Sequence, residues 1–380
     1  MNKGYDDIRP YHDAEVPAVI RDLLSDRELL TAIGRYRFPT LSRWFAPVAR
    51  KVIHGRLKQR FGVIGGVDQL QQVVRPWVRR ILEQTSRGLR VEGLENLDAN
   101  TTYLFMSNHR DIAMDPALIN YALVEAGLRT SRIGIGDNLL NKEYVSQLMR
   151  LNKSFVVKRS VQGRREKLDA FNQLSAYIRE SVQHGQHVWL AQREGRAKDG
   201  LDKTESAVLK MLHMSGKKHG WPLQQSLAQL NIVPVCISYE WDPCDKAKAR
   251  ELAALARDGE YHKTHDEDFR SIVRGIQGRK GRITIRFNEP LKVESDQAED
   301  WCRVLDRRIY AGYELYPINY QACMSLYGEL PDQAQSEQLS RADGHLASRL
   351  SVLNEDEQQQ LLKAYAQPVL MKYQWNPNDV

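Results

Sequence analysis

The stretch LFMSNHRDIAMDP, residues 104–116, decides the fold class because it joins a strand pattern to a helix pattern through a short polar loop. Residues 104–106 form an apolar run of the kind found in buried strands. Asp115 followed by Pro116 is a typical helix start, with aspartate at the N-cap and proline at the first helical position. This helix is expected to end at Gly127. The stretch therefore predicts a strand that leads directly into a helix.

The same alternation of strand and helix recurs through the middle of the chain. Short apolar runs typical of strands occupy 104–106, 133–135, 155–157, 188–191, 232–237 and 283–285. An amphipathic segment between two of them is expected to bury Leu168, Phe171, Leu174, Ile178 and Val182 and to stop at Gly185. Pro234 inside a strand suits an edge strand or a bulge. The pattern predicts an α/β fold, a mostly parallel mixed sheet flanked by helices, with functional residues at the carboxyl ends of strands.

Three regions follow from the change of pattern along the chain. Residues 1–85 read as an N-terminal helical region, with helices over 16–33 and 69–83. Residues 86–295 form the predicted α/β domain, and residues 296–380 form a helical C-terminal extension. Four cysteines without paired spacing indicate neither a disulfide framework nor a zinc site. No apolar run approaches the length of a membrane span, and the first residues lack an apolar signal region, so we expect a cytoplasmic protein.

The net charge of +7 is unevenly distributed. Between Glu28 and Asp68 there is no acidic residue. Eight cations occupy this window: Arg35, Arg37, Arg43, Arg50, Lys51, Arg56, Lys58 and Arg60. Aromatic residues lie among them, which suits a helix in the headgroup layer of an anionic membrane. A helical bundle with a solvated basic face explains the same pattern. A basic nucleic-acid-binding protein is the competing class without enzymatic activity, although no nucleic-acid motif accompanies the charge.

Candidate catalytic residues follow the first strand. A histidine with a nearby carboxylate, as in His109 and Asp115, is what a general base requires, because the carboxylate orients the imidazole and stabilises its protonated form. Basic residues also follow two later strands. They are Lys158 and Arg159 after the third apolar run, and Arg196 and Lys198 after the fourth, beside Glu194 and Gly195. Solvated loop charges explain any one of these residues, whereas four cations converging with a His-Asp pair are typical of a phosphate-binding site.

From about residue 88 to residue 291 the order of these motifs resembles the glycerophospholipid acyltransferase family. The resemblance rests on His109 with Asp115, on 155–159, on Glu194-Gly195-Arg196 and on 233–235. The soluble, plastid-type glycerol-3-phosphate acyltransferases are the most similar branch, through Asp-Pro-Ala at 115–117, Gly-Asp at 136–137, Trp-Leu-Ala at 189–191 and an N-terminal helical bundle. Five residues separate His109 from Asp115, whereas the family has four. Asp111 is therefore an alternative partner, although the residues after Asp115 continue the family pattern.

The resemblance implies transfer of a fatty acyl group from acyl-CoA or acyl-carrier protein to a hydroxyl of glycerol 3-phosphate, with 1-acylglycerol 3-phosphate as the alternative acceptor. His109 would act as general base and Asp115 would orient it. Lys158, Arg159, Arg196 and Lys198 would bind the acceptor phosphate. Gly195 would let the backbone approach the phosphate, and Glu194 would pair with one of the cations. The resemblance implies no metal and no cofactor. The expected location is the cytoplasm, peripheral on the inner face of the membrane.

Overall fold

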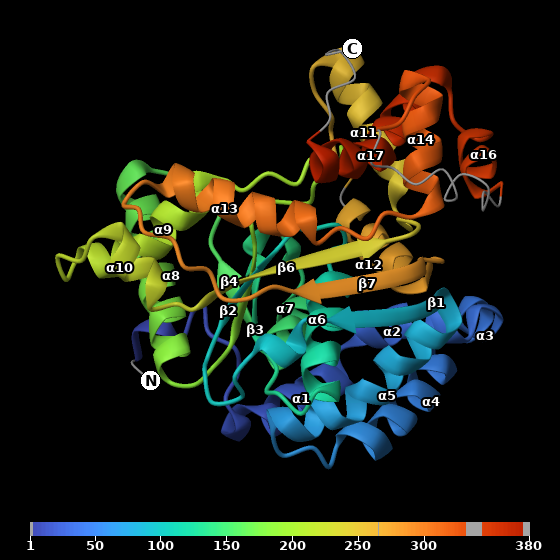
Figure 1. Cartoon of the computed structure of the whole chain (residues 1–380). Coiled ribbons are helices and arrows are strands. Elements are labelled where there is room, and N and C mark those ends of the chain that lie inside the picture. The colour runs from blue at the N-terminus through green and yellow to red at the C-terminus, as the bar shows by residue number, and fades with distance from the viewer. Residues whose placement is uncertain (1–2, 265, 332–343, 375–380) are drawn as a thin grey trace. The chain divides into compact units, whose positions relative to one another are not determined.

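The structure is a computed structural model that describes residues 3–264, 266–331 and 344–374. Two compact units divide the chain. The first unit combines residues 1–77 with 132–173, and the second combines residues 78–131 with 174–380 (Figure 1). The catalytic candidates His109 and Asp115 therefore lie in the second unit. The three-region division expected from the sequence, with limits at residues 85 and 295, stays a prediction.

The second unit is built around five strands. Their order is β1 (Ser86–Glu92), β7 (Gly281–Phe287), β6 (Ile232–Tyr239), β2 (Leu104–Ser107) and β5 (Val188–Ala191). The pairs β1–β7, β2–β6 and β2–β5 are parallel, and β6–β7 is antiparallel. Helices flank the strands (Figure 1). The α/β class with a mostly parallel mixed sheet is thus confirmed.

The edge strand β1 was not predicted from the sequence. Its sequence is SRGLRVE, and Arg87, Gly88 and Arg90 are exposed. A strand with solvent on one side does not need a continuous apolar run, so its pattern resembles a loop. Pro234 was expected at an edge or a bulge, which is wrong, since β6 lies between β2 and β7. Its carbonyl accepts hydrogen bonds from the backbone and side-chain amides of Asn288, at 2.9 and 3.1 Å.

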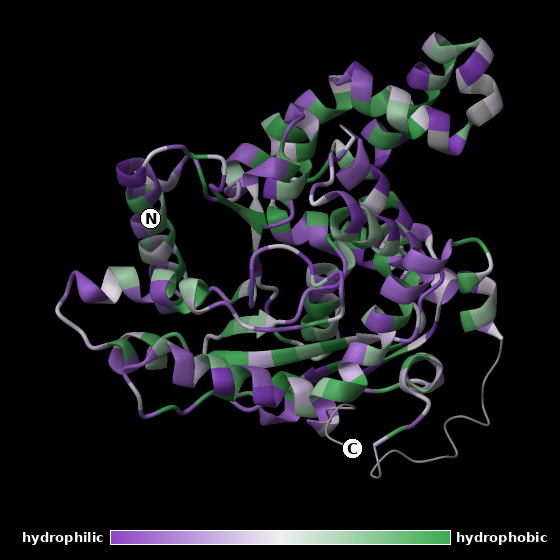
Figure 2. Ribbon diagram, turned by 90° about the horizontal axis from the view of Figure 1, so that it is seen from above, coloured by the Kyte–Doolittle hydropathy of each residue, from purple (hydrophilic) through white to green (hydrophobic). Residues whose placement is uncertain are grey.

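In the sequence, the helices of the second unit lie between its strands and in its C-terminal part. They are α6 (Met114–Glu125), α9 (Ser206–Lys217), α10 (Leu223–Ala228), α11 (Asp245–Asp258), α12 (Glu267–Gln277), α13 (Ala298–Ala311), α14 (Pro317–Tyr327), α16 (His345–Leu350) and α17 (Glu355–Tyr373). Helix α17 packs on α14 and on α11. Hydrophobic and hydrophilic residues alternate along several of these helices, α12 and α13 among them (Figure 2). This amphipathic pattern places their apolar sides in the core.

The first unit contains the parallel pair β3 (Arg132–Gly136) and β4 (Ser154–Val157). Its helices are α1 (Val16–Ser25), α2 (Arg27–Arg37), α3 (Pro39–Trp44), α4 (Ala46–Phe61) and α7 (Glu143–Leu151). The limits between the two units in the sequence fall within two helices, α5 (Val67–Thr85) and α8 (Arg164–Gln183). A core cluster of this unit includes Val16, Ile20 and Leu24 from α1 and Tyr144 and Leu151 from α7.

Two helix predictions need correction. The single helix expected over 16–33 is two helices, because Asp26 interrupts it and accepts a hydrogen bond from the Leu29 amide at 2.6 Å, as an N-cap does. Leu168 and Phe171 were expected to be buried but are 53% and 39% exposed. Periodicity identified their helix correctly, but it does not reveal how far along the helix the packing extends.

Candidate active site

His109 and Asp115 are in direct contact. Strand β2 ends at Ser107, α6 begins at Met114, and the loop between them carries His109. Nδ1 of His109 lies 2.8 Å from Oδ2 of Asp115. The Asp115 side chain is completely buried, and the His109 side chain is 14% exposed. A carboxylate against Nδ1 places the ring proton there and leaves the lone pair on Nε2, which no described residue bonds.

Three further donors hold the carboxylate of Asp115. Oδ2 accepts hydrogen bonds from the amides of Arg110 at 2.6 Å and Asp111 at 2.9 Å. Oδ1 accepts one from the Tyr239 hydroxyl at 2.7 Å. Asp115 was expected at the N-cap of its helix, but α6 begins one residue earlier, at Met114. The carboxylate therefore binds loop amides and the imidazole instead of capping the helix, and its position is fixed from both sides.

Asp111, the alternative partner, has a different role. Its Oδ1 accepts hydrogen bonds from the amides of Ala113 at 3.0 Å and Met114 at 2.9 Å, at the start of α6. Asp111 is buried. Burial raises the pKa of Asp111, and the neighbouring carboxylate of Asp115 adds to this effect. Asp111 thus starts the helix, and Asp115 contacts the histidine.

An aromatic residue supports His109 from strand β5. The ring of Trp189 meets the imidazole edge to face, with centroids 5.5 Å apart. Its indole N–H donates to the Ser107 hydroxyl at 3.0 Å. Ser107 is the last residue of β2 and is fully buried. The indole is therefore held in place by the strand that leads to His109, and it limits the movement of the imidazole.

The loop after β5 is hydrogen-bonded to the backbone of the histidine. The amide of Ala197 donates to the carbonyl of His109 at 3.0 Å. Gly195 has a φ of 71°, a left-handed conformation that favours glycine. Arg196 follows it and makes no ion pair or hydrogen bond with the described residues. The Glu194 amide donates to the carboxylate of Glu205 at 3.2 Å. Arg196 is therefore held close to His109 along the backbone, and its guanidinium is available to a ligand.

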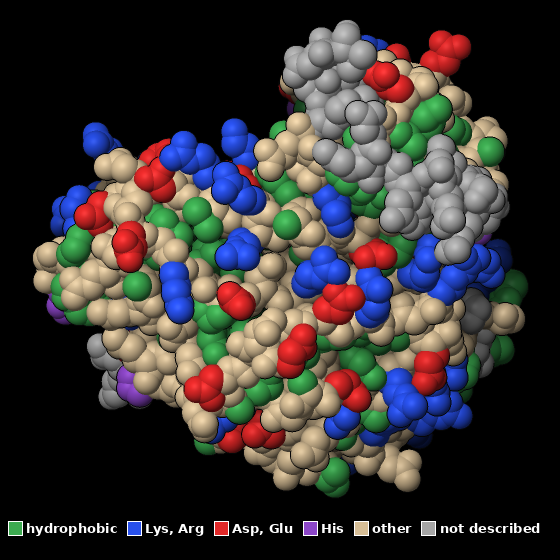
Figure 3. Space-filling model, viewed as in Figure 1, with side chains coloured by type: hydrophobic (Ala, Val, Ile, Leu, Met, Phe, Trp, Pro, Cys, Tyr) green, Lys and Arg blue, Asp and Glu red, His purple; other side chains and the backbone are tan. Residues whose placement is uncertain are grey.

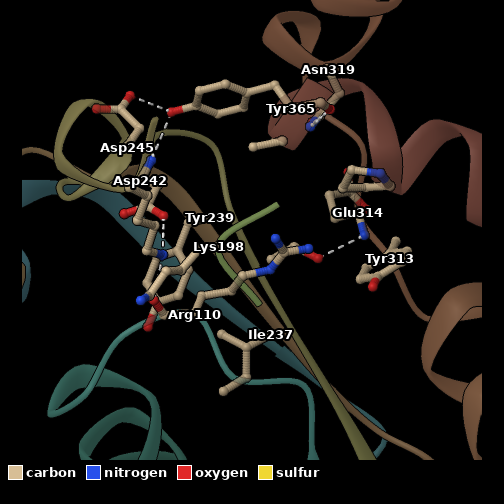
Figure 4. Close-up of a pocket in the computed structure, with 14 residues that line it drawn as sticks. Arg110, Lys198, Ile237, Tyr239, Asp242, Asp245, Tyr313, Glu314, Asn319 and Tyr365 are labelled. Atoms are coloured by element: carbon tan, nitrogen blue, oxygen red, sulfur yellow. Dashed lines mark hydrogen bonds and ion pairs between the residues drawn. The ribbon is translucent and has the colours of Figure 1, made fainter. Parts of the chain in front are cut away.

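Lys198 lines a pocket next to this loop and pairs with Glu251. Burial lowers the pKa of Lys198, although Glu251 opposes this effect. Figure 4 shows Arg110, Ile237 and Tyr239 on the same pocket as Tyr313 and Tyr365 from the C-terminal part of the chain. The pocket therefore joins the surroundings of His109 to residues far along the sequence.

Lys158 and Arg159 lie in the first unit, whereas His109 lies in the second. Lys158 pairs with Asp7 and donates to the side chain of Gln173 at 3.4 Å. The Arg159 amide donates to Asp137 at 3.1 Å. The structure thus gathers Glu194, Gly195, Arg196 and Lys198 into the unit that holds the His-Asp pair. For Lys158 and Arg159 a role in phosphate binding stays a prediction.

A buried polar network next to the catalytic loop was not predicted from the sequence. The Arg110 guanidinium donates to Asp202 at 2.6 Å, and the Tyr313 hydroxyl donates to the same carboxylate oxygen. Asn108 donates to Asp202 at 3.2 Å and to the carbonyl of Ile237 at 3.0 Å. Burial raises the pKa of Asp202, and the Arg110 guanidinium acts in the opposite direction. The position of Arg110 next to His109 in the sequence could have indicated its part in this network. No local pattern indicated that Tyr313 belongs to it.

Comparison with known proteins adds an independent finding. Residues 88–238 match the model of the family described as Acyltransferase. These residues form an acyltransferase domain. No curated protein matches the chain. Among solved structures, the chain is similar to a 1-acyl-sn-glycerophosphate acyltransferase from Thermotoga maritima, with 15% identity and a TM-score of 0.37 over 75% of this chain and 95% of that one. Resemblance to the plastid-type branch stays a prediction.

The matched acyltransferase domain contains His109, Asp115, Trp189, Arg196 and Lys198. The partners Tyr239, Glu251 and Tyr313 lie beyond its last matched residue. The C-terminal part therefore completes the surroundings of the acyltransferase site. Among the residues that the structure describes, no group of three or more His, Cys, Asp or Glu side chains is placed to hold a metal ion.

Proposed function

We propose that this protein transfers a fatty acyl group from an activated thioester to a hydroxyl of glycerol 3-phosphate, in phospholipid synthesis. The 2.8 Å contact between His109 Nδ1 and the buried Asp115 carboxylate, inside an acyltransferase domain, carries the proposal. A histidine with this partner and an unbonded Nε2 is equipped to accept a proton from a hydroxyl. The acceptor 1-acylglycerol 3-phosphate presents the same phosphate and a similar hydroxyl, so it belongs in the same test.

The proposed reaction is a direct transfer. Nε2 of His109 takes the proton of the acceptor hydroxyl while the hydroxyl oxygen attacks the thioester carbonyl carbon. The carbon–sulfur bond then breaks, the acyl–oxygen bond remains, and the departing thiolate takes the proton back from the imidazolium. Asp115 stabilises the positive charge on the ring between these two events. Arg196 would bind the acceptor phosphate with its planar guanidinium and thereby hold the hydroxyl near Nε2.

An acceptor panel tests the function directly. Purified protein is supplied with one labelled acyl-CoA, and separately with one labelled acyl-carrier protein. The acceptors are glycerol 3-phosphate, 1-acylglycerol 3-phosphate and glycerol. His109→Ala serves as the control, and the loss of a general base lowers turnover by roughly 100- to 10,000-fold. Label transferred to a phosphorylated acceptor, and lost in His109→Ala, is the expected result. Hydrolysis of the thioester without any transfer to an acceptor contradicts the proposal.

The proposed location is the cytoplasmic side, peripheral on the inner face of the membrane. Among the described residues, no helix combines the length and hydropathy that a membrane crossing requires. Trp44, Phe45, Val48 and Val52, from α3, α4 and the residue between them, are exposed. Exposed Arg43 and Lys51 belong to the same segment. Apolar side chains beside cations suit the headgroup layer of an anionic membrane, where a lipid product would be released.

A further inference from the structure

A second pocket of the second unit has a strongly basic lining. It has a volume of about 370 Å³ and lies around the loop before α11 and the end of α12. Its charged lining consists of Lys246, Arg250, Arg274, Arg279, Arg349 and one carboxylate, Asp245. All of these residues lie beyond the acyltransferase domain. Five cations around one hollow repel one another unless an anion joins them.

The protein itself neutralises few of these charges. In the described part of the chain, no carboxylate pairs with Lys246, Arg274 or Arg279. Arg250 lies 3.6 Å from Glu357. Arg349 pairs with Asp245, but its Nε is buried and has no hydrogen-bond partner among the described residues. A buried guanidinium N–H without a partner is costly, and it shows that the protein does not use the full hydrogen-bonding capacity of Arg349.

Asp245 pairs with one of these five described cations, Arg349, and leaves the side chains of the other four without a bond to it. Its Oδ2 accepts from Arg349 and from the Tyr365 hydroxyl at 2.9 Å, and its Oδ1 accepts from the Lys246 amide at 2.7 Å. The carboxylate thus orients Arg349 and is already saturated with donors. The pocket is also lined by the first turn of α11, a 14-residue helix, where the helix dipole favours negative charge.

The basic pocket is connected to the active site. Asp245 lines both this pocket and the pocket that contains Arg110 and Lys198. Lys248, one turn along α11, donates to the Arg110 carbonyl at 2.7 Å and to Asp242 at 2.5 Å. The amide of Arg110 in turn binds Asp115. A ligand with phosphates in the basic pocket therefore lies against Asp245, which also lines the pocket that contains Arg110 and Lys198.

We propose that this basic pocket binds a multiply charged phosphate group of a ligand that also reaches the active site. Arginine suits this ligand because its planar guanidinium binds phosphate oxygens in pairs. Two sources supply such a group: the nucleotide phosphates of a coenzyme A thioester, or the headgroup of an acidic lipid. Only the choice between these sources rests on the proposed acyltransferase function, because the phosphate site itself follows from the charges and the unpartnered Nε.

Calorimetry with three soluble probes, together with flotation on anionic and neutral vesicles, tests the site without any acyl transfer. The probes are inorganic pyrophosphate, coenzyme A and dephospho-coenzyme A, which lacks one phosphate. The test variant is Arg274→Gln with Arg279→Gln. Both side chains are exposed and free of ion pairs with the described residues, so the fold should be kept. The matched control is Arg270→Gln, an exposed arginine on α12 outside the pocket. Equal melting temperatures of all variants are checked first.

We expect the double variant to raise the Kd for pyrophosphate by about tenfold or more, since hydrogen bonds to charged groups are strong. Arg270→Gln should leave that Kd unchanged. An equal loss for coenzyme A, with weaker binding of dephospho-coenzyme A to the unmodified protein, assigns the pocket to the nucleotide phosphates. If the double variant loses binding to anionic vesicles but not to neutral ones, and still binds coenzyme A, the pocket is assigned to a lipid headgroup.

The proposal is overturned if pyrophosphate fails to bind, or binds the double variant and the unmodified protein equally. The proposed function fails separately: if no acceptor is acylated while pyrophosphate still binds through Arg274 and Arg279, the phosphate site stands without the acyltransferase activity.

Discussion

Tyr239 donates a hydrogen bond from its hydroxyl to Oδ1 of Asp115 at 2.7 Å, the carboxylate oxygen that His109 does not contact. Tyr239 ends strand β6, and Asp115 lies in the first turn of α6. Burial and the nearby Asp115 raise the pKa of Tyr239 well above its usual value, so the phenol stays protonated and remains a donor. The catalytic carboxylate is thus held between two elements that are distant in sequence.

Tyr239→Phe removes this donor and little else. We expect kcat to fall about tenfold, because a hydrogen bond to a charged carboxylate is lost while the carboxylate keeps its two amide donors. The KM values for both substrates should change little. Steady-state kinetics and the melting temperature provide the check. Unchanged kcat in a folded variant would show that the hydroxyl does not position Asp115.

Asp115→Asn and Asp111→Asn separate the two candidate partners of His109. In Asp115→Asn the side-chain oxygen can replace Oδ2, but the negative charge that stabilises the protonated imidazole is lost. Activity should fall roughly 100- to 10,000-fold. Asp111→Asn keeps an oxygen for the amides of Ala113 and Met114 and should remain substantially active. The opposite ranking would assign Asp111 as the functional partner.

The same Asp111 variant changes the pH dependence of stability. The pKa of Asp111 is raised in the folded state, so the protonated carboxyl is favoured there. Its stabilising effect is present below the ordinary carboxyl pKa, about 4, and is lost as the pH rises through the raised value. Asp111→Asn does not titrate, so it does not lose this stability. Its melting temperature should therefore decline less than that of the unmodified protein as the pH rises from about 4 through the raised pKa of Asp111. Parallel melting curves against pH would contradict this.

Arg196→Ala tests the phosphate anchor. Its guanidinium has no partner among the residues that the structure describes, so its removal leaves no orphaned carboxylate there. We expect the KM for a phosphorylated acceptor to rise about tenfold or more, with little change for glycerol, because a charge-assisted bond is lost. Lys203→Ala, an exposed cation of the same loop, is the matched control. Equal losses on both acceptors would show a structural role for Arg196.

Gly275→Ala tests the packing of α12 against the catalytic loop. A Cβ at Gly275 would meet Oδ2 of Asp111 at 2.0 Å, so the carboxylate that starts α6 must move. We expect a loss of about 1 to 3 kcal/mol in the free energy of unfolding, and lower kcat. Gly55→Ala in α4, with no atom within 4 Å of its Cβ, should instead stabilise by about 0.5 to 1 kcal/mol. Equal stability of the two variants would show that α12 adjusts freely.

Flotation with liposomes tests the membrane-facing segment. Binding to anionic vesicles should exceed binding to neutral ones and weaken with salt, since each cation contributes about 1 kcal/mol near an anionic surface. Reversing Arg43, Arg50, Lys51, Arg56 and Lys58 should abolish it, and Trp44→Ser with Phe45→Ser should weaken it at every salt concentration. Equal recovery in the soluble fraction under all conditions would reject the proposal.

The sequence by itself determined the features that depend on neighbours in the chain. Short apolar runs located the strands from β2 to β7, because a buried strand needs apolar residues on both faces. His109 and Asp115 were found as a pair because one loop carries the first and the helix after it carries the second. The basic residues after β5 follow from the same local reasoning.

Only the tertiary structure decided which groups meet. The choice of Asp115 over Asp111 depends on where α6 begins, and each residue of difference turns a helix side chain by about 100°. Tyr239 reaches Asp115 because parallel pairing sets β6 beside β2. Tyr313 reaches Asp202 across 111 residues of chain. Local patterns carry no information on such contacts, since they arise from the register of strands and the packing of helices, and the basic pocket around Arg349 arose in the same way.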